Sequence, residues 1–104
     1  MKKEVIKNIL KDCFWEYNFS ENDIISLANS SNKQEQLFLF SKILENAKEL
    51  LKSMKIFDEN NLKSLIEAYK IPMFKYEYMS RRINILEYYF LNKELTINEL
   101  KWIA

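Results

Sequence analysis

The 104-residue chain contains no glycine and no histidine. A domain of this length carries about seven glycines on average, and glycine supplies the left-handed turns and close backbone approaches of phosphate-binding loops. Histidine is the most common acid–base group near neutral pH and a frequent metal ligand. The two absences therefore exclude the usual glycine-rich nucleotide-binding loops and the catalytic arrangements that need a histidine.

Cysteine, proline and long apolar runs are also scarce. The single cysteine, Cys13, has no partner for an internal disulfide, which favours a reducing compartment. The longest apolar runs have four residues, as at 37–40, so no transmembrane segment is expected. The first residues lack the apolar core of a signal peptide. Together these features predict a cytoplasmic protein.

Apolar and charged residues are plentiful. The chain is 48% hydrophobic and includes seven Phe, six Tyr and two Trp, enough for one compact core in a single domain over residues 1–104. Charged residues make up 30% of the chain and nearly cancel, which leaves a net charge of +1. This balance argues against a strongly basic surface for nucleic acid.

The spacing of the apolar residues predicts an all-α protein. Apolar side chains recur at intervals of three and four residues almost everywhere, which is typical of amphipathic helices. We expect a compact bundle of five or six helices, with the two long helices as the core pair. A short last helix or an extended tail would follow. The expected ranges are 3–17, 21–29, 33–54, 59–69, 73–91 and 97–103.

Three of the expected helix starts follow one pattern, a capping residue preceded by an apolar residue. The apolar residues of the three starts are 38 positions apart, so a repeated unit of one short and one long helix is one explanation. The simpler explanation is that helix starts resemble one another. Without glycine, helix ends must rely on Pro72 and on asparagines. The three starts are Phe19-Ser20, Phe57-Asp58 and Leu95-Thr96.

Reactive constellations are not found. Cys13 falls on the apolar face of the first helix and has no histidine to activate it, so it is expected to be a core residue. Glu45 and Glu49 share a helix face, but neighbouring lysines make this a charge-balanced, solvated surface rather than a cation site. We therefore predict no catalytic, metal-binding or cofactor-binding residues and no enzyme activity.

A few residues break the amphipathic pattern and are candidates for a partner-binding surface. On a helical wheel Trp15 points away from the core face of the first helix, and Phe38 projects among charged residues. The helix over 73–91 carries two apolar stripes, so it is expected to be central and to touch two other helices. Arg82 lies within the second stripe and is expected either against a buried acid or at a partner surface. The predicted partner-binding residues are Trp15, Phe38, Arg81, Arg82 and Tyr88.

Other interpretations of these residues remain open. Tyrosines and basic residues mix along 70–93, a composition that also suits single-stranded nucleic acid. Glu77 and Glu87 interrupt the basic residues, however, and no helix has the polar, basic character of a major-groove reader. A self-associating structural protein, with a homodimer formed through the same aromatic face, is another alternative, and so is ordinary surface packing.

Two segments resemble a known group of proteins. FWEYNFSENDI at 14–24 and FKYEYMSRRINILEYYFLNK at 74–93, with Trp102 near the end, resemble small helical prokaryotic proteins encoded beside abortive-infection-type nucleotidyltransferase toxins. The resemblance covers most of the chain. It implies a small helical antitoxin or accessory partner of such a toxin, which would act by steric occlusion through the 73–91 helix. It implies no catalytic residue.

Overall fold

The computed structural model describes residues 2–94, and all the regular structure in that range is helical. The all-α prediction is therefore confirmed, while the helix expected at 97–103 lies outside the described residues. Five of the described helices begin within three residues of a predicted start, and the other results from a break in a predicted helix. The helices are α1 (Lys2–Cys13), α2 (Glu21–Ala28), α3 (Lys33–Asn46), α4 (Leu50–Met54), α5 (Glu59–Ala68) and α6 (Tyr76–Leu91).

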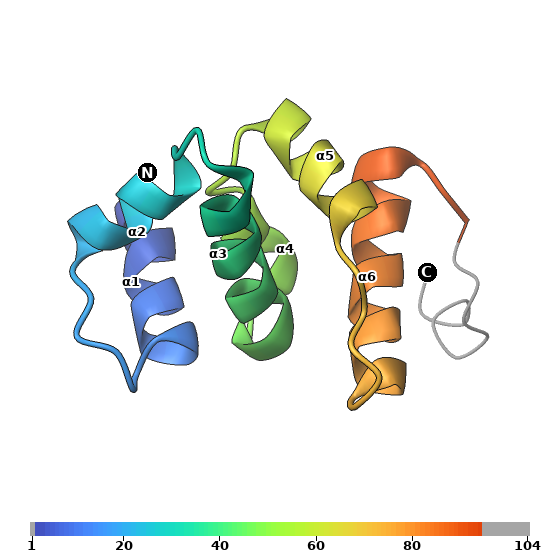
Figure 1. The fold of residues 1–104 in the computed structure, drawn as a ribbon, viewed down its shortest axis with the longest axis horizontal. Helices are drawn as coiled ribbons and strands as arrows, with labels where there is room; N and C mark the ends of the chain where they lie inside the picture. Colours follow the sequence, from blue (N-terminus) through green and yellow to red (C-terminus); the bar gives the residue numbers. More distant parts are fainter. Residues whose placement is uncertain (1, 95–104) are drawn as a thin grey trace.

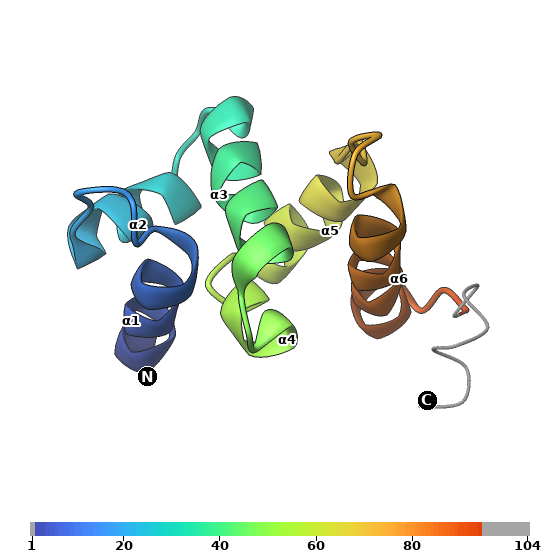
Figure 2. The same ribbon diagram turned by 90° about the horizontal axis from the view of Figure 1, so that it is seen from below.

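Helix α3 is the centre of the molecule. It packs against all the other described helices, and Leu39, Phe40, Ile43 and Leu44 on its inner face are fully buried. The ribbon shows α1 and α2 on one side of α3 and α5 and α6 on the other (Figure 1), and the view turned by 90° shows the same order (Figure 2). The α6 helix packs mainly on α3 and α5. It therefore touches two helices as expected, but it lies at the edge of the array rather than in its middle.

Two of the three marked helix starts lie in the described residues and are formed as predicted, while Leu95-Thr96 lies outside them. The side chain of Ser20 accepts a hydrogen bond from the backbone N–H of Asp23, and the Asp23 carboxylate accepts one from the backbone N–H of Ser20. Asp58 caps α5, and Asn32 caps α3 by accepting from the N–H of Gln34 at 2.9 Å. Local capping chemistry thus sets where these helices begin.

The first helix ends at Cys13 rather than at residue 17. After Cys13 the chain turns tightly, and the N–H of Tyr17 donates to the carbonyl of Phe14 at 2.9 Å. Phe14 is 2% exposed, and its ring lies 5.2 Å from the ring of Phe19 and 6.0 Å from that of Phe38. Burial of this ring cluster explains why the chain leaves the helix while its apolar spacing is still helical.

The long helix expected over 33–54 is broken into α3 and α4. Ala47 has an extended conformation, with φ −66° and ψ 132°, although the sequence has no proline or glycine here. Two side chains from other helices bind the backbone groups that the break exposes. Arg82 on α6 donates through Nε to the carbonyl of Leu44 and through Nη2 to that of Ala47 at 2.5 Å. From α1, the Asp12 carboxylate accepts from the N–H of Lys48 at 3.3 Å.

Two residues in the left-handed conformation bound α6. Lys75, with φ 64°, precedes the helix, which therefore begins at Tyr76 and not at residue 73. Asn92, with φ 56°, follows it, and its N–H donates to the carbonyl of Glu87. Glycine normally fills such positions, and asparagine is the usual substitute at a helix end. In this chain without glycine, an asparagine and a lysine occupy the two left-handed positions.

Replacing Arg82 with alanine is expected to lower the free energy of unfolding by about 2 kcal/mol, because the carbonyls of Leu44 and Ala47 lose a charged donor. Arg82→Lys is expected to recover only part of the loss, since lysine lacks the planar guanidinium. Urea denaturation followed by circular dichroism measures the change. The control is Lys7→Ala, at an exposed position on α1. Equal midpoints for Arg82→Ala and Lys7→Ala would contradict the role assigned to Arg82.

Because Asn92 has a left-handed backbone, substituting it with alanine and with glycine is expected to change the stability of the protein in opposite directions. Asn92→Ala places a Cβ without a compensating side-chain group in this conformation and is expected to cost about 1 kcal/mol of stability. Asn92→Gly is expected to be as stable as the original chain or more so. Thermal unfolding of the two variants under identical conditions compares them, and a more stable alanine variant would contradict the assignment.

Candidate interaction surface

The exposed hydrophobic side chains are concentrated in one part of the chain. Of nine large hydrophobic residues that are exposed among residues 2–94, six lie between positions 73 and 89, on α6 and the loop before it. Single exposed apolar residues are common, whereas a group of them marks a surface that binds something. The six are Met73, Phe74, Tyr76, Tyr78, Tyr88 and Tyr89, and the other three are Trp15, Tyr17 and Ile25.

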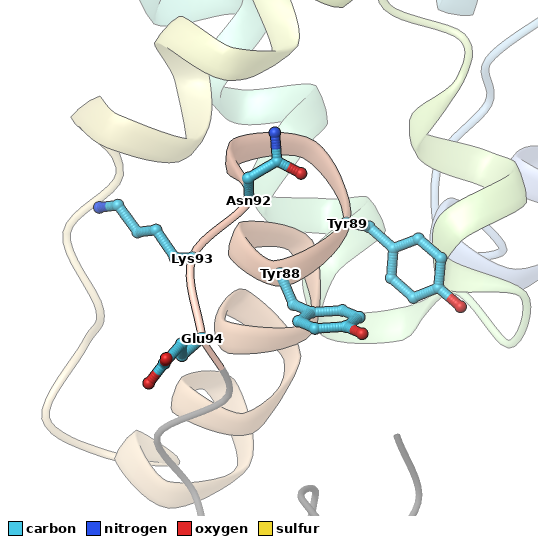
Figure 3. A pocket seen from close by; sticks show the side chains of 5 residues that line it. All are labelled: Tyr88, Tyr89, Asn92, Lys93 and Glu94. Carbon is cyan, nitrogen blue, oxygen red and sulfur yellow. The ribbon is translucent and has the colours of Figure 1, made fainter.

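One group lies along the solvent side of α6. Glu77, Arg81 and Tyr88 follow one another at helical spacing and are exposed, with Tyr89 beside them; we call these four residues the α6 outer face. The rings of Tyr88 and Tyr89 meet edge to face with their centroids 5.6 Å apart. Both rings project from the last turns of α6 (Figure 3). This face therefore combines two aromatic rings with charges of both signs.

A shallow cleft of about 340 Å³ adjoins the two tyrosines. Its other lining residues are Asn92, Lys93 and Glu94, which follow the helix (Figure 3). The ammonium of Lys93 lies 3.9 Å from the Glu87 carboxylate. The cleft is open and contains polar groups on one side and aromatic rings on the other, which suits a side chain of a partner better than a buried cofactor.

The loop before α6 forms a second exposed group. Met73 is 89% exposed and Phe74 is 69% exposed, directly after Pro72. The loop is held against the end of α3, because the ammonium of Lys75 lies 3.8 Å from the Glu45 carboxylate and the Tyr78 hydroxyl donates to the Glu45 carbonyl at 2.8 Å. Two large apolar side chains thus project from a loop that is fixed at its base.

The loop between α1 and α2 lies at the same end of the molecule, with the C-terminal end of α3 between the two loops (Figure 1). Trp15 on this loop is 63% exposed. Both loops and α3 line a cleft of about 280 Å³, which includes Trp15, Lys42, Glu45 and Lys75. We call the exposed hydrophobic side chains of these two loops and of the first turn of α6 the end face. They are Trp15, Tyr17, Met73, Phe74, Tyr76 and Tyr78.

The structure does not bring the five predicted partner-binding residues together. Arg81 and Tyr88 share the α6 outer face, whereas Trp15 belongs to the end face. Phe38 lies beside a charged residue as expected, because the Lys42 ammonium is 5.9 Å from the centroid of its ring. The ring is nevertheless partly buried, with ring centroids 6.0 Å from Phe14 and 6.2 Å from Tyr17, because the chain after α1 folds back over α3.

Arg82 does not lie against a buried acid, which was one of its two expected positions. Its guanidinium contacts backbone carbonyls at the end of α3 instead of an acid, and it lies 5.4 Å from the centroid of the Tyr78 ring. The sequence analysis also missed Met73 and Phe74, which it assigned to the first turn of a helix. Their position directly after the only proline was the signal for an exposed loop.

The described residues bear on two kinds of reactive group, a cluster of metal ligands and a cysteine thiol. Residues 2–94 contain no group of three or more His, Cys, Asp or Glu side chains placed to hold a metal ion. Cys13 is 3% exposed. Burial, and next the nearby Asp12 carboxylate, raise the pKa of the Cys13 thiol to about 12. The thiol is therefore protonated at neutral pH, which makes it a poor nucleophile.

Cys13 also predicts how stability depends on pH. The unfolded thiol loses its proton near its ordinary pKa of 9, whereas the folded thiol keeps it up to about 12. Between these values the unfolded state binds fewer protons, so the free energy of unfolding falls as the pH rises. Urea denaturation from pH 8.5 to 11 should show a steeper fall for the original chain than for Cys13→Ala. Equal slopes would contradict the assigned pKa.

None of the described helices is long and apolar enough to span a bilayer. Comparisons of the chain with protein-family models, curated proteins and solved structures find no match.

Proposed function

We propose that this protein is a non-catalytic interaction module that binds another protein through the α6 outer face. The observation that supports this most is the pair of exposed rings, Tyr88 and Tyr89, that lies beside Arg81 on the last turns of α6. Tyrosine and arginine are enriched at the positions that contribute most to protein–protein binding. Arg81, Tyr88 and Tyr89 provide both residue types on one helical surface.

The charge distribution favours a protein over single-stranded nucleic acid. Nucleic acid would need a continuous positive surface beside the stacking rings. The α6 outer face and the residues after it contain two acids, Glu77 and Glu94, and two basic residues, Arg81 and Lys93. The Lys93 ammonium is already close to the Glu87 carboxylate. A surface with both signs of charge suits a partner that has both signs as well.

The fixed position of α6 supports binding by a preformed surface. Arg82 ties the middle of the helix to the end of α3, and Tyr78 ties its first turn to Glu45. A surface that is ordered before it binds loses less conformational entropy on association. A rigid helix at the edge of the array can cover a site on a partner, so steric occlusion is the mechanism that we propose.

The resemblance described in the sequence analysis supplies the partner to test first, a nucleotidyltransferase-type toxin for which this chain would serve as antitoxin or accessory subunit. The direct experiment is to co-express the chain with the product of its adjacent gene and to purify it by a tag on one of the two. We expect the pair to co-purify. We also expect Arg81→Glu combined with Tyr88→Ala to weaken binding by at least about 30-fold, because two central side chains are lost.

The matched control carries the same kinds of change at exposed positions on the other side of the array, Lys7→Glu on α1 with Ile25→Ala on α2. It should leave binding unchanged. Failure of the original chain to co-purify, or equal binding by both double variants, would exclude the α6 outer face as the contact for this partner. A steeply salt-dependent affinity for single-stranded oligonucleotides would instead favour nucleic-acid binding.

A further inference from the structure

The end face is a second exposed surface. Its residues come from the loop before α2, the loop before α6 and the first turn of α6, where Glu77 of the α6 outer face lies between Tyr76 and Tyr78. Tyr88 lies twelve residues after Tyr76, about 18 Å along the helix axis. The end face and the Tyr88 end of α6 can therefore bind different molecules at the same time. The base of the end face is fixed, because Lys75 and Tyr78 both contact Glu45.

The accessible area of the end-face residues approaches that of a standard protein contact. Whole aromatic side chains have roughly 200 Å² of accessible surface each, so the exposed fractions of its six residues amount to on the order of 700 Å². A standard interface covers about 800 Å² on each partner. Exposure of this much apolar surface in one place is unusual for a protein that stays monomeric.

The charges of the end face suit a second copy of the same chain. In a twofold dimer the same surface meets itself, so each group needs a complementary group on its own face. The cleft at the middle of the end face is lined by two lysines, Lys42 and Lys75, and by two acids, Glu16 and Glu45. Lys75 and Glu45 already pair within one copy, which leaves Lys42 of one copy to approach Glu16 of the other. A face with one sign of charge would repel itself instead.

We propose that two copies of this chain form a symmetric dimer through their end faces. The exposed rings of Trp15 and Phe74 and the side chain of Met73 are the principal apolar contacts, and the charged cleft of each copy aligns with that of the other. The dimer leaves Tyr88 and Tyr89 of both copies accessible, about 18 Å along α6 from the contact, so it would present two identical binding surfaces. It does not depend on the partner proposed for α6.

Sedimentation velocity on the purified chain alone tests this proposal, with protein concentrations from low micromolar to near millimolar. We expect a species of twice 12.6 kDa that dissociates on dilution. Trp15→Ser combined with Phe74→Ser should raise the dissociation constant of the dimer by at least about 100-fold, since both are large, exposed rings. The matched control is Ile25→Ser, which removes an exposed hydrophobic side chain outside the end face.

The outcomes are distinct. A chain that is monomeric at every concentration overturns the proposal, and so does a dimer that Trp15→Ser with Phe74→Ser leaves intact. The substituted side chains are exposed, so we expect the variants to keep the fold. Circular dichroism and thermal unfolding check this. A monomer that still co-purifies with the adjacent gene product would refute the dimer and retain the function proposed for α6. A dimer that does not co-purify with the adjacent gene product would retain the dimer proposal and refute the function proposed for α6.

Discussion

The contact between Arg82 and the end of α3 determines how the two sides of the molecule are joined. A helix that stops without a cap leaves its last carbonyls without donors, and burying them costs free energy. Arg82 on α6 donates two N–H groups to the carbonyls of Leu44 and Ala47, which precede it in the sequence by 38 and 35 residues. The corner between α3 and α4 and the position of α6 are therefore fixed by the same guanidinium.

Both exposed surfaces depend on this arrangement. The α6 outer face keeps its orientation because the opposite side of α6, with Met79 and Leu86, is buried against the core. The end face exists because the C-terminal end of α3 receives the two loops on either side, with Glu45 in contact with the α6 side. The α6 outer face is thus placed by buried packing, whereas the end face is placed by contacts of Glu45 that are themselves partly exposed.

Local signals in the sequence predict much of the fold. The starts of α2, α3 and α5 follow from Ser20, Asn32 and Asp58, because a cap acts on the N–H groups within three residues of it. The end of α1 and the break after α3 could not be predicted in this way. They depend on the burial of Phe14 and on Asp12 and Arg82, which contact residues far away in the sequence.

The candidate surfaces were also predictable where they depend on local helical spacing and not where they depend on contacts between distant segments. Helical spacing places Arg81 and Tyr88 on one face of α6, because both lie within a regular helix. The same spacing did not show that Phe38 is covered by the segment after α1, and it assigned Met73 and Phe74 to a helix that begins only after Lys75. Periodicity describes a helix in isolation and carries no information on which neighbouring segment folds over it.

The position of Arg82 in the chain also bears on the order of events during synthesis. Arg82 follows Ala47 by 35 residues, so α1 to α4 leave the ribosome while the carbonyls at the end of α3 still face water. The first four helices can collapse around Phe40 and Ile43, but their corner acquires its last donors only after α6 has emerged. The corner between α3 and α4 therefore reaches its native hydrogen bonding only after the chain has been translated past Arg82, late in synthesis.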